Sequence, residues 1–204
     1  MIVVLTLALL SQDSSSLALR RRVWNGLSTL ERAEQHLTTR REHRADTAAA
    51  RVLADVRSDL DTMVFATSWG AAELDQLRLA FPGSELLTRY AARLDERAGR
   101  PEAALAEMDR LIWRDPADAE LQRTRGRLLD VVQRPREALD AYARALDLDP
   151  ENDSTFRSLQ GLAERLGTLD GLLDQIRRLR IRLPNSRTLA DHETEVSQRL
   201  GVRR

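Results

Sequence analysis

The chain has 204 residues, of which 42% are hydrophobic and 31% charged, so it can bury a core and still keep a hydrated surface. Its 32 basic residues, all arginine, balance 32 acidic residues, which argues against a nucleic-acid binder that works by bulk electrostatic attraction. Cysteine is absent from the sequence, and this excludes disulfides, thiolate zinc sites and cysteine nucleophiles.

Residues 1–18 are a candidate signal or membrane anchor. Residues 1–10 are strongly apolar but shorter than the roughly 20 residues that a membrane span needs, and Ser16-Leu17-Ala18 fits a small-x-small cleavage pattern. The first basic cluster, 20–22, follows this segment instead of preceding it. Export to the periplasm or cell envelope is favoured over a cytoplasmic location, and a buried or membrane-associated segment is the alternative. Membrane association is expected only through residues 1–18.

Residues 19–50 are expected to form a charged N-terminal helix. The stretch 20–44 is rich in Arg and Glu and is interpreted as one helix that packs on the first repeat or on another chain. Its sparse apolar residues are Trp24, Leu27, Leu30 and Leu37. The spacing from Ala45 to Val64 predicts a second helix with one apolar face. That face consists of Val52, Leu53, Val56, Leu60 and Met63.

An internal repeat of 34 residues governs the rest of the chain. Prolines recur at this spacing, and a residue that can cap a helix follows each of them two positions later. The prolines are Pro82, Pro116, Pro150 and Pro184, and the caps are Ser84, Asp118, Asn152 and Ser186. The helices that these caps open are predicted over 85–98, 119–132, 153–166 and 187–200.

A second helix follows the first in each repeat. Gly99 and Gly167 share one repeat position and are expected to end first helices in the left-handed conformation. Pro101 and Pro135 suit the first turn of the second helices, 102–114 and 136–148. The latter helices carry apolar residues at helical spacing together with small alanines, which allow neighbouring helix axes to approach closely.

These features resemble the tetratricopeptide repeat family. Residues 119–152 match its pattern with Gly126, Ala138, Tyr142, Ala145 and Pro150. The neighbouring repeats match it less fully, and together 51–84, 85–118, 119–152 and 153–186 make up a repeat region over 51–186. The resemblance implies an all-α fold: a right-handed α-solenoid of antiparallel helix pairs, with residues 187–204 as a C-terminal capping helix.

The sequence lacks the patterns typical of catalytic and metal-binding sites. The histidines, His36, His43 and His192, are not spaced as metal ligands, and exposed, solvated side chains are expected for them. The sequence has no nucleophile elbow, phosphate loop or dinucleotide fingerprint. We therefore expect no catalytic residues, metal or cofactor, and no enzymatic activity.

An arginine ladder is the candidate binding site. By the family resemblance, positions 5 and 9 of each first helix, counted from Glu85, Ala119 and Asp153, face a concave groove. These positions carry Arg89, Arg93, Arg123, Arg127 and Arg157. Guanidinium groups suit carboxylates, so an acidic peptide or a free C-terminus is the expected ligand. The alternative is a solvated face, since the second helices carry a similar column at Arg110, Arg144 and Arg178.

The sequence is compatible with two functions. The resemblance favours a protein–protein interaction scaffold or adaptor that holds a peptide or helix of a partner in its concave groove. The alternative is a structural component of a cell-envelope assembly, anchored or exported through the N-terminal segment.

Overall fold

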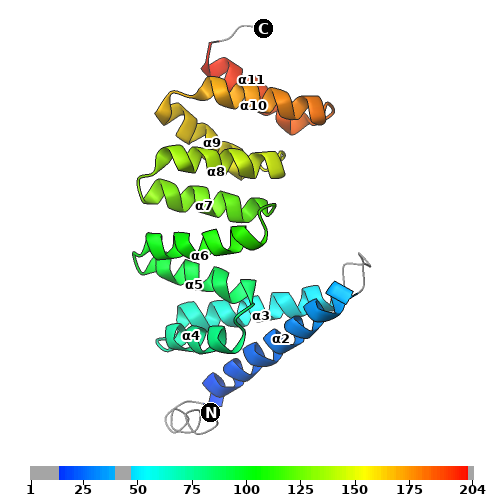
Figure 1. Ribbon diagram of the computed structural model, residues 1–204, viewed down its shortest axis with the longest axis vertical. Coiled ribbons are helices and arrows are strands. Elements are labelled where there is room, and N and C mark those ends of the chain that lie inside the picture. Colours follow the sequence, from blue (N-terminus) through cyan, green and yellow to red (C-terminus); the bar gives the residue numbers. More distant parts are fainter. Residues whose placement is uncertain (1–13, 40–46, 202–204) are drawn as a thin grey trace. The chain divides into compact units, whose positions relative to one another are not determined.

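The computed structural model describes residues 14–39 and 47–201, and its side-chain detail excludes residues 33–39 and 47–49. Within these ranges every regular element is an α-helix (Figure 1). The chain divides into two compact units, Met1–Leu94 and Asp95–Arg204, with the boundary inside α5. The helices are α2 (Ser14–Thr39), α3 (Thr47–Ala66), α4 (Gly70–Ala80), α5 (Glu85–Arg97), α6 (Pro101–Arg114), α7 (Ala119–Val131), α8 (Pro135–Leu148), α9 (Asp153–Leu166), α10 (Leu169–Arg182) and α11 (Arg187–Arg199).

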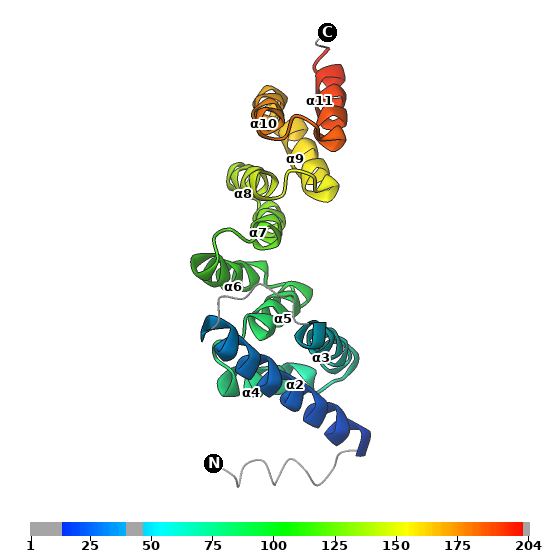
Figure 2. The ribbon, with the colours of Figure 1, turned by 90° about the vertical axis from the view of Figure 1, so that its right-hand side faces the viewer.

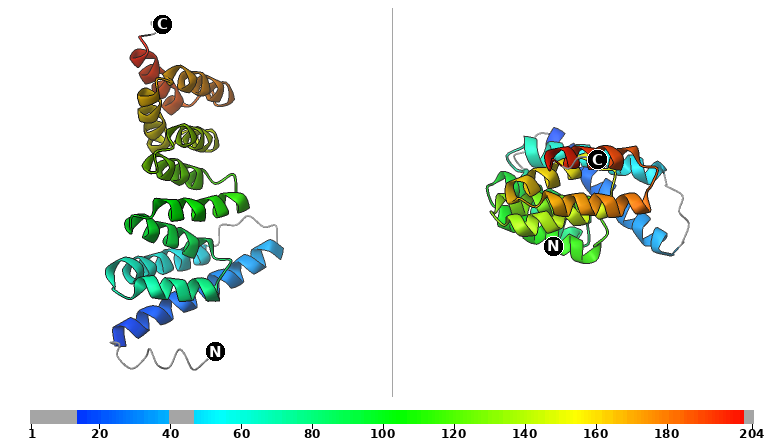
Figure 3. Two further views of the ribbon diagram at one scale, coloured as in Figure 1. Left: turned by 60° about the vertical axis from the view of Figure 1, so that its left-hand side comes forward. Right: turned by 90° about the horizontal axis from the view of Figure 1, so that it is seen from above.

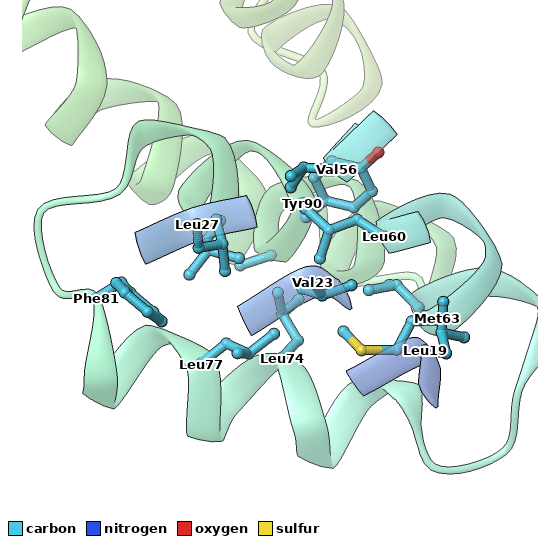
Figure 4. Close-up of a cluster of buried hydrophobic side chains, with 13 residues drawn as sticks. Leu19, Val23, Leu27, Val56, Leu60, Met63, Leu74, Leu77, Phe81 and Tyr90 are labelled. Carbon is cyan, nitrogen blue, oxygen red and sulfur yellow. The ribbon is translucent and has the colours of Figure 1, made fainter. Parts of the chain in front are cut away.

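The N-terminal unit is built on the long helices α2 and α3. Their apolar faces meet in one core that α4 and the start of α5 complete (Figure 4). The core side chains labelled there are Leu19, Val23, Leu27, Val56, Leu60, Met63, Leu74, Leu77, Phe81 and Tyr90. Gly26 brings α2 against α3, because a Cβ atom at this position would lie 2.1 Å from Cγ2 of Val56.

Helix α2 differs from the prediction at its start. It begins at Ser14 instead of near residue 20, so the cleavage pattern Ser16-Leu17-Ala18 lies within its first turns. Leu19 directly after the pattern is buried in the core. Residues 1–13 and 40–46 lie outside the described residues, and so does the side chain of Leu37. The helix predicted from Ala45 to Val64 is α3, Thr47–Ala66.

Polar and aromatic contacts hold α2 against the α3–α4 hairpin. The guanidinium of Arg20 lies 4.5 Å from the ring centroid of Trp69 and forms an ion pair with Glu73. Trp24 meets Phe81 edge to face at a centroid distance of 5.0 Å. The predicted packing of this helix on the first repeat is therefore intramolecular.

The C-terminal unit consists of stacked antiparallel helix pairs. Figure 2 shows α7, α9 and α11 in one layer and α6, α8 and α10 in the other. The hairpins α7–α8 and α9–α10 can be followed in Figure 3. Helix α11, the predicted capping helix, packs on α10 and α9 and buries its own Leu189 and Val196. None of the helices in the described part of the chain is both long and apolar enough to cross a bilayer.

The predicted helix ends are confirmed. Asp118, Asn152 and Ser186 each accept a hydrogen bond from the third amide of their helix, and Ser84 makes the corresponding contact at 3.4 Å. Gly99 and Gly167 have φ values of +72° and +67°. Pro101 and Pro135 begin α6 and α8.

Small residues set the spacing between helices of one repeat. Ala104 and Ala138 have no exposed surface. A Cβ atom on Gly126 of α7 would lie 2.9 Å from the Tyr142 ring of α8, so the bare backbone lets this ring fit against it. The glycine and the tyrosine at these two repeat positions are therefore a matched pair.

Candidate functional site

The arginines at repeat position 5 pair with carboxylates of their own helix. Arg89 donates to Glu85 at 2.7 Å, Arg123 to Glu120 at 2.8 Å and Arg157 to Asp153 at 2.9 Å. Each carboxylate lies in the first turn, where the helix dipole favours negative charge. All three guanidinium groups are therefore held near the N-terminal ends of the first helices, the helices on which the repeat predicts them.

The arginines at position 9 pair with carboxylates of the preceding first helix. Arg93 of α5 donates to Asp61 of α3 at 3.0 Å. Arg127 of α7 binds Glu96, in the last turn of α5, through both of its terminal nitrogens. The hydrogen bonds from Arg127 hold the pKa of the Glu96 carboxyl below its usual range. These two arginines therefore connect helices.

The same connection recurs further along the C-terminal unit. Arg165 of α9 binds both carboxylate oxygens of Asp130 on α7, the shorter bond being 2.6 Å. Arg199 of α11 likewise binds Glu164 of α9. The acceptors Glu96, Asp130 and Glu164 stand 34 residues apart. This acidic column, which the sequence interpretation missed, carries the repeat's own signal and could have been found from it.

The acid at Glu96 differs from the other two in having no arginine 35 residues later, and this difference explains the position of Arg127. Asp130 and Glu164 bind arginines 35 residues later, whereas the residue 35 positions after Glu96 is the exposed Val131. Arg127 lies one helical turn before Val131 and takes over the contact. Arg127 is thus the structural equivalent of Arg165 and Arg199.

Tyr142 reaches the face on which these arginines lie. Burial raises the pKa of its hydroxyl, and the neighbouring Ser158 hydroxyl together with the charges of Arg127 and Arg123 acts in the opposite direction. The hydroxyl therefore lies between α7, which carries both arginines, and α9, which carries Ser158 directly after Arg157.

The N-terminal unit holds Arg93 in an aromatic setting. Its guanidinium lies 4.7 Å from the centroid of the Phe65 ring and 5.0 Å from that of Tyr90. Burial, followed by the charge of Asp61, raises the pKa of Tyr90 to about 12, and its hydroxyl donates to the Arg57 carbonyl at 2.8 Å. Arg93 thus interacts with Asp61 and with both rings inside the N-terminal unit, and we interpret this cluster as a packing contact.

The predicted site is therefore divided. Arg89 and Arg93 belong to the unit Met1–Leu94, and Arg123, Arg127 and Arg157 belong to Asp95–Arg204. All five lie on first helices, as the repeat predicted, and all five bind carboxylates of the chain itself. Whether they bind a partner stays a prediction.

The prediction for His192 is wrong. It was expected to be solvated, but only 3% of it is exposed and its ring stacks on Phe156 at a centroid distance of 3.6 Å. Nε2 lies 3.3 Å from Asp153, and burial lowers the pKa of the imidazole. Its spacing of three and four residues from Leu189 and Val196 is that of a buried helix face, a signal present in the sequence.

The other two histidines lie in parts of the chain for which side chains are not described: His36 in 33–39 and His43 in 40–46. Among the side chains that are described, no group of three or more His, Asp or Glu residues is placed to hold a metal ion.

Comparisons with known proteins bear on the fold. MamA from AMB-1 superposes with a TM-score of 0.51 at 16% identity, covering 84% of this chain and 94% of MamA. A tetratricopeptide repeat protein from Parabacteroides merdae superposes with a TM-score of 0.50 at 16% identity, over 93% of this chain and 75% of that protein. The chain has the tetratricopeptide repeat fold. The predicted all-α architecture of repeated helix pairs is therefore confirmed.

Matches of another kind were not found: no protein-family model matches the chain, and no curated protein does. Identities of 16% establish a tetratricopeptide repeat architecture and leave the function to be argued from the residues of this chain.

Proposed function

We propose that this tetratricopeptide repeat protein is a protein–protein interaction scaffold that binds an acidic segment of a partner on its first helices, without cofactor or covalent chemistry. The observation that carries the proposal is the recurrence of Arg89, Arg123 and Arg157 at one repeat position, each pairing with a carboxylate through a guanidinium that remains partly exposed. A guanidinium that already binds one carboxylate has the geometry to bind another.

The charge of the chain determines the kind of recognition. Since the net charge is zero and these arginines all have acidic neighbours, long-range attraction of an acidic partner is weak. Recognition would instead depend on short-range, directional hydrogen bonds from a periodic set of guanidinium groups. Within Asp95–Arg204, Arg123 and Arg157 form such a set, and it suits an extended or helical peptide whose acidic side chains recur along its length.

The repeat offers a matched pair of triple variants for the test. In the first, Arg89, Arg123 and Arg157 are all changed to Gln. In the control, the second-helix column Arg110, Arg144 and Arg178 is changed in the same way, with the same loss of charge at the same 34-residue period. Proteins captured from native extract by each variant and by the unchanged chain are compared by quantitative mass spectrometry, after circular dichroism has shown equal helix content.

We expect a partner that the unchanged chain and the control triple retain and the first triple loses, and we expect the retained contact to map to an acidic segment. Equal retention by both triples would move the binding surface away from these arginines. Equal loss from both would reduce the interaction to general charge and would overturn the assignment to the first helices.

A further inference from the structure

The two kinds of ion pair on the first helices differ in what an incoming carboxylate would have to displace. Arg123 and Glu120 are three residues apart on α7, and the Glu120 side chain is 52% exposed. Arg127 and Glu96 come from different helices, and the Glu96 side chain is 30% exposed. Separating the first pair leaves the helix packing unchanged, whereas separating the second removes a connection between α7 and the end of α5.

We propose, building on the function above, that Arg123 is a ligand-contacting residue whose site Glu120 occupies in the free protein, so that partner binding exchanges one carboxylate for another. Arg127, together with Arg165 and Arg199, is a positioning residue that holds neighbouring helices and does not contact the ligand. Of the residues predicted for the site, position 5 thus binds and position 9 supports.

The geometry of the Glu120 pair supports exchange. Nε and Nη2 of Arg123 donate to separate oxygens of Glu120, the side-by-side arrangement that a peptide carboxylate would adopt. An exposed pair of this kind contributes little to folding, because water solvates both charges when they separate. The internal carboxylate therefore lowers the affinity for an acidic ligand without being needed for the fold.

Arg157 has the same kind of partner but a less suitable test position. Asp153 accepts from Arg157 at 2.9 Å and also lies 3.3 Å from Nε2 of His192, the stacked ring on the buried face of α11. A change at Asp153 would disturb the packing of α11 as well as the arginine. Both hydrogen bonds described for Glu120 join it to Arg123, and its charge also acts on Arg127 of the same helix. Its removal therefore breaks no hydrogen bond between helices in the described part of the chain, and Glu96→Gln serves to detect any effect that passes through Arg127.

The chain also provides a control with nearly the same pair elsewhere. Arg134 donates through Nε and Nη2 to the two oxygens of Glu137, at 2.7 and 2.6 Å, and the pair again spans three residues. It lies at the start of α8, a second helix, outside the proposed binding face. Glu120→Gln and Glu137→Gln therefore remove the same charge and break equivalent ion pairs.

The experiment measures the dissociation constant of a dye-labelled, C-terminally amidated oligoglutamate peptide by fluorescence anisotropy at one fixed, low ionic strength. Amidation leaves side-chain carboxylates as the peptide's acidic groups. We expect Glu120→Gln to tighten binding about two- to fivefold, the factor that matches an exposed ion pair. Glu137→Gln and Glu96→Gln should not tighten it, and Arg123→Gln should weaken it in all backgrounds.

Two outcomes distinguish exchange at Glu120 from acid binding by Arg123. If the unchanged chain binds the peptide and Arg123→Gln loses it, but Glu120→Gln binds no more tightly than Glu137→Gln, the arginine binds acids and Glu120 is not its competitor. If neither the unchanged chain nor Glu120→Gln binds oligoglutamate, the acidic partner itself is excluded, and the inference with it.

Discussion

In Asp95–Arg204, helices of 13 or 14 residues follow one another with a side-chain cap at the start of α7, α9 and α11. Met1–Leu94 instead contains helices of 26 and 20 residues, α2 and α3, packed face to face along a shared apolar core. In Asp95–Arg204 the same repeat position therefore supplies the caps of α7, α9 and α11. In the described part of Met1–Leu94, by contrast, the close approach of α2 to α3 depends on a single contact, that of Gly26 with Val56.

This difference determines how far local damage should spread. A stack of repeats is stabilised by each repeat and its neighbours, so its parts can unfold separately. A core shared by α2, α3, α4 and the start of α5 has no such internal boundary. The C-terminal unit is therefore expected to lose structure in steps and the N-terminal unit in one step.

The largest effect should come from removing a core side chain in each unit. Phe156 and Leu60 have no exposed surface. Phe156→Ala should cost about 3–5 kcal/mol and Leu60→Ala about 2–5 kcal/mol of unfolding free energy, through lost burial and the cavity left behind. Hydrogen exchange followed by mass spectrometry should show Phe156→Ala exposing α9–α11 with α7 and α8 protected, and Leu60→Ala exposing α2, α3 and α4 together.

Each variant serves as the other's control. Loss of protection over the whole chain in both would show a single cooperative structure and contradict the contrast between the units. Loss confined to α3 in Leu60→Ala would show that the N-terminal core is itself divisible.

The repeat made the C-terminal unit predictable in detail. Asp118, Asn152 and Ser186, which recur every 34 residues, predicted the starts of α7, α9 and α11, because the first-turn amides of each helix need a hydrogen-bond acceptor. Gly99 and Gly167 marked the helix ends for an equally local reason. Residues at one repeat position predict the structure wherever every repeat has the same local requirement.

Other features could not be read from single columns. The pairing of Arg127 with Glu96 depends on Val131 standing where an arginine stands in the following repeats, so it requires the three-dimensional neighbours. The early start of α2 at Ser14 depends on burial of Leu19 against a core formed later in the chain. The imidazole of His192 is a polar group, a property that favours exposure, but its place on the buried face of α11 decides its environment.

A smaller effect should follow from repairing one helix end in the C-terminal unit. Gln133 has a φ of +60° at the repeat position where Gly99, Gly167 and Gly201 also have positive φ. The Cβ atom of Gln133 strains this left-handed backbone, and glycine removes the strain. The entropy that glycine adds to the unfolded chain offsets part of this benefit, so Gln133→Gly should raise the unfolding free energy by a net amount of about 0.5–1 kcal/mol. The midpoint of urea unfolding measures the gain.

Two variants bracket this result. Gln133→Ala retains a Cβ atom and should give no comparable gain, whereas Gly167→Ala introduces the same strain at φ +67° and should lose a similar amount. If the Gly and Ala variants at position 133 were equally stable, a Cβ atom in the left-handed conformation would not be the source of the strain.

The smallest effect concerns the end of the stack and is seen on mild acidification. Burial lowers the pKa of His192, partly offset by Asp153 on α9 and Glu195 on α11, while Arg157 acts in the same direction as burial. The unfolded chain therefore binds a proton at His192 more readily than the folded one. Stability from this group is complete above the unfolded pKa of about 6.5 and is lost as the pH falls below it.

Carboxylates affect a different range of pH. The pKa values of Glu96 and Glu193 are lowered by the arginines that bind them, so the stability they contribute is lost only as the pH falls below the ordinary glutamate value of about 4.3. Between pH 7.5 and pH 5.5 the melting temperature of the unchanged chain should fall, with hydrogen exchange increasing first in α11. His192→Gln keeps a polar side chain that does not titrate, and should flatten this slope. If the melting temperature of His192→Gln fell with pH as steeply as that of the unchanged chain, groups other than the buried imidazole would cause the pH dependence.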